Sequence, residues 1–293
     1  MINKAKGKLV ILAGGVSSRM KNSVAAGEQI DEKILKDAVT KSKGMIRIGS
    51  NGRPFLDYLL LNALQSGYKE FVVVISEKDN SIREYYEKLS PGNLNLSYAV
   101  QPVPLGRVKP LGTADALYCA LKSKPEWTGS FFTVCNSDNL YSHTALKLLL
   151  EPSHANALID YDRDGLEVDK ERIEKFAVTK KDDSGFLVDI VEKPSKEEIE
   201  SAKGDDGSVR VSMNIFKFNY DMIYPYLENV PLHPVRQEKE IPSAIKMMIA
   251  ANPKSLYCYP LCERVPDLTS KNDILIVKKF LENNYSDFSF SEL

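Results

Sequence analysis

A glycine pair directly after a short apolar run is the feature of this sequence that most clearly suggests chemistry. The run at 8–13 is followed by Gly14 and Gly15, and the chain continues with VSSRM at 16–20. Glycines let backbone N–H groups approach an oxyanion closely, and a helix or turn that starts there adds its dipole. Arg19 offers a planar, permanently charged fork for phosphate oxygens. The segment predicts a phosphate-binding loop, although an ordinary turn after a strand has the same glycine pair.

Two aspartates are candidates for holding a divalent cation. Asp138 follows an apolar run at 130–135, and open parallel sheets bind ligands at the carboxyl ends of their strands. It could instead be the N-cap of a helix at 140–150. Asp267 follows a proline and could be a plain turn residue. Two carboxylates are enough to hold Mg²⁺ beside phosphates, because water completes its octahedron.

Lys43, Gln101 and Gly112 could contact a nucleotide. Lys43 would neutralise phosphate charge, although its polar surroundings also fit a solvated lysine. Gln101 can offer a donor and an acceptor to a base edge, and Gly112 lets backbone groups approach it. Gln101 could equally be a polar loop residue before a proline.

Glu192, Lys193 and Asn214 could contact an acceptor molecule. Glu192 can accept hydrogen bonds from hydroxyl groups, and Lys193 can pair with a phosphate, but the two also fit an exposed turn before Pro194. Asn214 lies in an apolar stretch, and a buried amide needs hydrogen-bond partners. A ligand contact at Asn214 follows as a hypothesis.

The elements that would position these residues follow from apolar periodicity. In the first half, short apolar strands at 8–13, 71–75, 94–100 and 130–135 alternate with helices at 54–66, 80–89 and 113–122. Such alternation predicts parallel pairing and a doubly wound α/β sheet. The second half is less regular. It predicts strands at 157–161, 174–179, 185–192 and 209–218, helices at 220–228, 241–251 and 273–283, and a solvated loop with a short helix at 195–208.

The composition of the chain limits the kinds of partner that we expect it to bind. The 293 residues carry a formal net charge of -1, so the whole chain has no attraction for nucleic acid or an anionic membrane. The apolar run after the basic N-terminus is too short for a signal peptide or a membrane span. Four scattered cysteines indicate reduced thiols. We therefore expect a cytoplasmic protein without nucleic-acid or membrane partners. Its oligomeric state stays open, a homo-oligomer included.

The loop at 12–20 resembles the opening motif of the nucleotidyltransferases that make nucleotide sugars, Leu-Ala-Gly-Gly-x-Gly-x-Arg-Met/Leu. The likeness runs through nearly the whole chain, and thymidylyl- and uridylyltransferases for glucose 1-phosphate are the better-known members. The further segments that resemble the family's motifs are KGMIRI at 43–48, QP at 101–102, KPLGTA at 109–114, VCNSDN at 134–139, VEKP at 191–194, VSMNIF at 211–216 and VPDLTS at 265–270.

This resemblance implies the Rossmann-like fold of nucleotide-diphospho-sugar transferases, with a mostly parallel mixed sheet. It implies a single domain over residues 1–293, with a nucleotide-binding half at 1–150 and an acceptor-binding half at 151–293. The implied reaction transfers NMP from an NTP to a sugar 1-phosphate and releases pyrophosphate, with Mg²⁺ as cofactor.

The resemblance also assigns roles to individual residues. Catalytic roles fall on Arg19, Lys43 and Asp138, and the metal ligands are Asp138 and Asp267. Nucleotide binding falls on Leu12, Ala13, Gly14, Gly15, Ser17, Ser18, Gln101, Gly112 and Thr113, and acceptor binding on Asn139, Glu192, Lys193 and Asn214.

Some positions depart from the family pattern. Ser17 replaces the usual third glycine, Val265 replaces a common tryptophan, Thr269 replaces a glycine, and residues 22–41 form a polar insertion. Other phosphorylated acceptors therefore stay open, such as phosphocholine or a molybdenum cofactor, as does a catalytically silent regulatory relative. An NAD-binding oxidoreductase would fit the first half, but the sequence lacks the Gly-x-Gly-x-x-Gly fingerprint.

Overall fold

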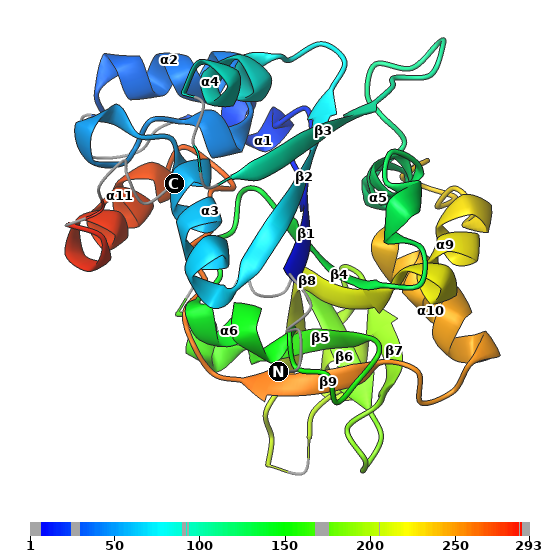
Figure 1. Ribbon diagram of the computed structural model, residues 1–293. Coiled ribbons are helices and arrows are strands. Elements are labelled where there is room, and N and C mark those ends of the chain that lie inside the picture. The colour runs from blue at the N-terminus through cyan, green and yellow to red at the C-terminus, as the bar shows by residue number, and fades with distance from the viewer. Residues whose placement is uncertain are drawn as a thin grey trace, which may run out of the picture. The chain divides into compact units, whose positions relative to one another are not determined.

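The chain forms two compact units built from interleaved segments (Figure 1). The computed structural model describes residues 7–24, 30–89, 92, 94–167, 176–204, 206–286 and 288. Unit 1 takes its residues from Met1–Pro110, Asn136–His143 and Pro266–Leu293, and unit 2 from Leu111–Cys135 and Thr144–Val265. Across the described ranges, no helix is both long and apolar enough to cross a membrane.

Unit 1 is built on three parallel strands. β1 (Gly7–Leu12) pairs with β2 (Tyr68–Ser76), and β2 pairs with β3 (Asn95–Gln101). The apolar runs of β1 and β2 are buried, as expected for parallel strands with both faces covered. Parallel pairing brings the three carboxyl ends to one edge, where Leu12, Ser76 and Gln101 end their strands.

The helices of unit 1 surround these strands. They are α1 (Ser18–Asn22), α2 (Glu32–Thr40), α3 (Phe55–Ser66), α4 (Ser81–Leu89) and α11 (Asp273–Asn284), with short 3-10 turns η1 (Lys43–Met45) and η2 (Ser50–Gly52). In Figure 1, α3 lies beside β2 and α1 lies past the end of β1. α3 begins after Pro54 and ends at Ser66, and the C-cap residue Gly67 has a φ of 114°, as is common at helix C-termini.

Unit 2 is organised around one long strand, β8. Its strands are β4 (Phe131–Asn136), β5 (Ala157–Asp162), β6 (Ala177–Lys181), β7 (Leu187–Val191), β8 (Arg210–Asn219) and β9 (Tyr257–Leu261). β8 runs antiparallel to β4, β5 and β6, whereas β5 pairs with β9 in parallel. β7 pairs with β6. Unit 2 is therefore a mixed sheet.

Three helices of unit 2 gather in Figure 1, namely α5 (Thr113–Lys122), α9 (Tyr220–Asn229) and α10 (Ile241–Ala251). The other helical segments of this unit are α6 (His143–Leu148), α8 (Lys196–Glu200) and the 3-10 turns η3 (Pro125–Trp127) and η4 (Asp164–Leu166). α8 begins with a capping box in which the Ser195 hydroxyl and the Glu198 carboxylate bond each other's backbone N–H groups.

The structure confirms the predicted α/β class and corrects some elements. β9 and α2 were not predicted, because the first contains a proline and the second lies in a polar insertion. The strand expected at 174–179 is β6, which begins at Ala177, and residues 174–175 lie outside the described part. The helix considered at 140–150 is the shorter α6, so Asp138 is not its N-cap.

Gly112 is the N-cap residue of α5, and the backbone of Lys239 lies close to it. Its φ is 115°, and a Cβ there would lie 2.5 Å from the Lys239 carbonyl oxygen. That oxygen accepts a hydrogen bond from Ala114 N at 3.0 Å, and Lys239 N donates to Leu111 O at 2.5 Å. Thr113 Oγ1 accepts from the backbone N–H of Ile241 at 3.1 Å. Packing within unit 2 therefore explains the glycine without a ligand.

We predict that Gly112→Ala destabilises the fold more than Gly129→Ala does. Both glycines have positive φ, but a Cβ at Gly129 meets no atom within 4 Å. The difference between the variants isolates the collision with the Lys239 backbone, which should cost about 1–3 kcal/mol beyond the shared strain. Equilibrium denaturation measures both, and equal losses would show that the collision relaxes freely.

Candidate active site

The glycine turn lies at the carboxyl end of β1. Leu12 O accepts a hydrogen bond from Ser137 N at 3.1 Å, and Ala13 N donates to Val74 O at 2.9 Å. A Cβ at Gly14 would lie 3.4 Å from both the Gln101 Oε1 atom and the Ile75 carbonyl carbon, while Gly15 faces open space. The turn thus rests on the ends of β2 and β3, beside the buried amide of Gln101.

Ser17 closes this turn in a left-handed conformation, with φ 54° and ψ 32°. Such a conformation strains every residue except glycine, which explains why the resembling motif has a glycine at this position. The Ser17 hydroxyl donates to Gly15 O at 3.5 Å. α1 then begins at Ser18 and presents Arg19 as an exposed side chain. Serine therefore adopts the left-handed backbone conformation that glycine adopts more easily, and phosphate binding by this turn stays a prediction.

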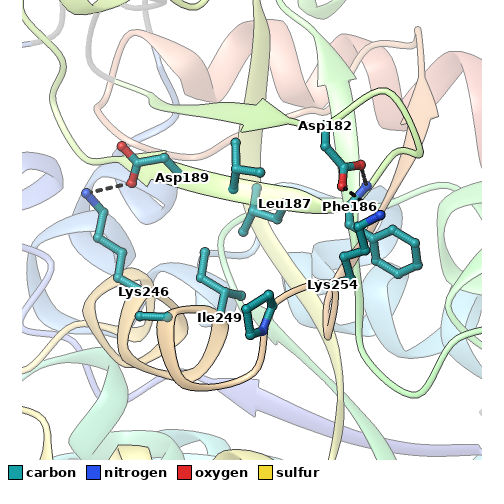
Figure 2. A pocket seen from close by; sticks show the side chains of 10 residues that line it. Asp182, Phe186, Leu187, Asp189, Lys246, Ile249 and Lys254 are labelled. Carbon is teal, nitrogen blue, oxygen red and sulfur yellow. Dashed lines mark hydrogen bonds and ion pairs between the residues drawn. The ribbon is translucent and has the colours of Figure 1, made fainter.

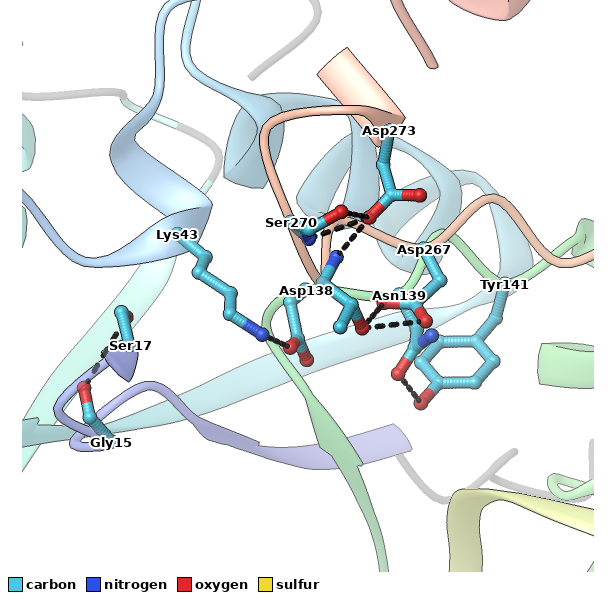
Figure 3. Close-up of polar contacts among 10 residues, drawn as sticks. Gly15, Ser17, Lys43, Asp138, Asn139, Tyr141, Asp267, Ser270 and Asp273 are labelled. Carbon is cyan, nitrogen blue, oxygen red and sulfur yellow. Dashed lines mark hydrogen bonds and ion pairs between the residues drawn. The ribbon is translucent and has the colours of Figure 1, made fainter. Parts of the chain in front are cut away.

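Lys43 and Asp138 form an ion pair. The Lys43 Nζ atom lies 2.7 Å from Asp138 Oδ2, with side-chain exposures of 11% and 21% (Figure 3). η1 brings the lysine there, and Gly44 allows the approach, because a Cβ at Gly44 would lie 3.3 Å from Ser137 O. A cation and a carboxylate thus face each other just after β4, next to the end of β1.

A short antiparallel bridge brings Asp267 beside this pair. Asn139 bridges to Asp267, and two backbone hydrogen bonds frame the bridge: Leu140 N to Pro266 O at 2.9 Å and Leu268 N to Asp138 O at 2.8 Å. Pairs of this kind have closely spaced side chains. Figure 3 shows Asp138, Asn139 and Asp267 together in unit 1. The amide of Asn139 is buried, and its Oδ1 accepts from the Tyr141 hydroxyl at 3.4 Å.

The segment after Asp267 supports this carboxylate through residues that were not predicted as part of the site. The Thr269 hydroxyl lies 3.0 and 2.9 Å from the two Asp267 oxygens. Asp273 Oδ2 in turn accepts from Thr269 N at 3.0 Å and from Ser270 N at 2.6 Å. A signal for this was present, because Ser270 and Asp273 have the spacing of a helix-capping motif ahead of an apolar run.

The donor set of unit 1 suits a hard cation. Among the described residues, no three His, Cys, Asp or Glu side chains gather into a metal-binding group. Asp138 and Asp267 nevertheless supply two carboxylates from paired backbone segments, and oxygen donors are what Mg²⁺ prefers. The two aspartates fit a cation that also takes phosphate and water ligands. Their role as ligands stays a prediction.

In unit 2, Glu192 and Lys193 follow directly after β7 in a charged environment. Burial raises the pKa of the Glu192 carboxyl, and the nearby Glu240 carboxylate adds to this, while Arg236 and Lys193 oppose it. Burial also raises the pKa of Glu240, which is ion-paired with Arg236. Arg236 and Glu240 were not singled out from sequence, where the charged run at 236–240 was the available signal.

Lys193 and Asn214 share the unusual backbone conformation of Ser17. Their φ values are 48° and 57°, and only seven non-glycine residues of the described part have positive φ. Asn214 N donates to the Ser212 hydroxyl at 3.1 Å, beside an irregularity in the pairing of β5 with β8. Strained backbone concentrates at functional sites. Three predicted site residues, Ser17, Lys193 and Asn214, thus have a strained backbone conformation. Their binding roles stay predictions.

A cavity of about 380 Å³ lies elsewhere in unit 2, between β7 and α10 (Figure 2). Leu187 and Ile249 form part of its apolar lining, and ion pairs border it, including Lys246 with Asp189 at 2.9 Å. None of the predicted site residues lines this cavity.

Known proteins resemble this chain over most of its length. Glucose-1-phosphate adenylyltransferase of Francisella tularensis subsp. tularensis (strain WY96-3418) is 25% identical over 272 residues, or 89% of this chain and 60% of that protein. The enzyme of the same name from Hydrogenovibrio crunogenus is 27% identical over 225 residues, or 74% and 48%. Bifunctional protein GlmU of Staphylococcus epidermidis is 23% identical over 278 residues, or 92% and 51%. The chain thus spans about half the length of these relatives.

The sequence profile of the nucleotidyl transferase family matches residues 38–279. The match includes Lys43, Asp138 and Asp267 and begins after the glycine turn. With most of the chain matched, and with the glycine turn, the lysine–aspartate pair and the second aspartate already described in unit 1, this protein belongs to the nucleotidyl transferase family.

Proposed function

We propose that this protein transfers NMP from an NTP to a sugar 1-phosphate, forming an NDP-sugar and releasing pyrophosphate. The observation that carries the proposal is the assembly at the edge of unit 1, where Lys43 pairs with Asp138 and a backbone bridge holds Asp267 alongside. The names of two of the similar proteins, both glucose-1-phosphate adenylyltransferases, support this acceptor class.

The proposed reaction needs charge control more than acid–base catalysis. The attacking phosphate oxygen is already anionic, so no strong general base or covalent intermediate is required. Repulsion between two polyanions and charge on the transferred phosphoryl group limit the rate, so positioning and electrostatic stabilisation carry the catalysis. The exposed Arg19 guanidinium and the Lys43 ammonium are the cations of unit 1 that would neutralise the triphosphate.

Mg²⁺ is the cofactor that we propose, held by Asp138 and Asp267. When bound, it would supply positive charge to the phosphate oxygens during transfer. Lys43 already places a positive charge 2.7 Å from Asp138 Oδ2, so the carboxylate is oriented toward a cation. Thr269 orients the other carboxylate through its hydroxyl.

We assign the remaining residues to the two substrates. The turn from Leu12 to Ser18 would bind the triphosphate, and the buried Gln101 amide would read the base. Asn139, Glu192, Lys193 and Asn214 would bind the acceptor. Gly112 and Thr113 would approach the nucleotide through backbone atoms, in addition to the contact of Gly112 with Lys239 and of Thr113 with Ile241.

We also place the protein in the cytoplasm. The four cysteines are free thiols, two of them buried, and reduced thiols suit that compartment.

The function is tested by measuring pyrophosphate release with ATP, GTP, CTP, UTP and dTTP. Each NTP is paired in turn with glucose 1-phosphate, with other sugar 1-phosphates and with phosphocholine. We expect release with at least one sugar 1-phosphate. We predict that Asp138→Asn lowers that turnover by more than about 100-fold, because the neutral amide lacks the negative charge that attracts a divalent cation. Asp162→Asn is the control, since this ion-paired aspartate has the same 21% side-chain exposure and should retain activity. Full Mg²⁺-dependent turnover in Asp138→Asn would refute the metal assignment. Pyrophosphate release with phosphocholine and with none of the sugar 1-phosphates would refute the proposed acceptor class.

We predict that Lys193→Gln raises the acceptor KM by about 10- to 100-fold and leaves the NTP KM nearly unchanged. The range corresponds to one charge-assisted hydrogen bond of about 1.5–3 kcal/mol. Lys196→Gln, an exposed lysine three residues further on, should change neither constant. Equal rises in both KM values would remove Lys193 from the acceptor site.

A further inference from the structure

The polar insertion at 22–41 contains a buried charge. Its described part includes α2, and Asp37 in this helix is only 2% exposed. A buried carboxylate is unfavourable unless charged partners and hydrogen bonds compensate for its lost hydration. Asp37 therefore needs partners.

These partners flank Lys43 on both sides in the sequence. Arg47 grips Asp37 with two side-chain hydrogen bonds, from Nε to Oδ2 at 2.6 Å and from Nη2 to Oδ1 at 3.0 Å. Its backbone N adds a third to Oδ2 at 3.3 Å, and Lys41 Nζ lies 3.0 Å from Oδ1. Burial by itself would raise the pKa of Asp37, but the hydrogen bonds from Arg47 and Lys41 outweigh it and lower the pKa.

Further hydrogen bonds and contacts hold residues 41–47 in place. Ser42 N donates to Asp79 Oδ2 at 3.2 Å, and Phe55 N donates to Ile46 O at 3.1 Å. Gly44 lies against Ser137, next to Asp138. Residues 41–47 are thus held at both ends, and Lys43 is the residue between these fixed points whose ammonium reaches the site.

We propose that Asp37 is a positioning residue that fixes segment 41–47, so that the Lys43 ammonium meets the triphosphate. This inference rests on the proposed function for its kinetic consequence, whereas the fixation itself is a property of the fold. The insertion that departs from the family pattern would thus support the catalytic lysine.

The test compares Asp37→Asn with Asp31→Ala. Asp31 caps the same helix by accepting a hydrogen bond from Lys33 N at 2.7 Å, so its loss weakens α2 without touching segment 41–47. We predict that Asp37→Asn raises the NTP KM by about 10-fold and leaves the acceptor KM unchanged. Asp31→Ala should leave both unchanged. Equal effects of the two variants would reduce Asp37 to a helix-stabilising residue and overturn the proposal.

A double-mutant cycle tests whether Asp37 affects the NTP KM through Lys43. If Asp37 acts through Lys43, Asp37→Asn should raise the NTP KM little further in a Lys43→Ala background. Additive effects would overturn the proposal. If Asp37→Asn does not fold, Arg47→Gln removes the same grip from a side chain that is 45% exposed, and the same kinetic pattern is required of it.

Amide hydrogen exchange separates this proposal from the proposed function. Exchange at residues 42–47 should speed up in Asp37→Asn and stay unchanged in Asp31→Ala, whether or not the protein turns over. If the wild type releases no pyrophosphate with any substrate pair, the proposed function is refuted. The exchange data would still show whether Asp37 holds segment 41–47 in place. Unchanged exchange in Asp37→Asn would overturn the proposal that Asp37 is a positioning residue.

Discussion

The site of unit 1 depends on tying the segment that carries Asp138 to the segment that carries Asp267. Both residues are acidic, so the arrangement needs a rigid backbone and a nearby cation. Backbone hydrogen bonds between Asp138 and Leu268 and between Leu140 and Pro266 provide the first. Lys43 provides the second at 2.7 Å. A segment near the C-terminus is thereby tied to the end of β4, and the carboxylates are positioned before any ligand binds.

Backbone strain occurs at predicted site residues in each of the two units. Ser17, Lys193 and Asn214 adopt positive φ without being glycine, and such conformations persist only where surrounding contacts enforce them. At Ser17 the need is local, because the chain must turn from β1 into α1 within five residues. The family motif meets this need with glycine, so the serine changes the energy of the turn while its shape remains.

Sequence alone predicted what depends on local pattern. The apolar runs of β1 and β2 identify buried parallel strands, and the glycine pair after β1 predicts a turn at the edge where they end. The contact of Asp37 with Arg47 could not be predicted, because the apolar pattern of α2 indicates a buried face but not that a carboxylate lies in it. β9 was missed because Pro260 and half-buried tyrosines obscure its pattern.

Gly112 shows why a motif glycine is ambiguous evidence of binding. A Cβ there would collide with the Lys239 carbonyl oxygen, and the same segment caps the start of α5. A glycine needed for packing and one needed for a close-fitting ligand look the same in sequence. Gly15, in contrast, has no atom of the described residues within 4 Å of a Cβ built there, so no packing contact in that part of the chain explains the absence of a side chain. Of the two, Gly15 is therefore the stronger argument for a bound phosphate.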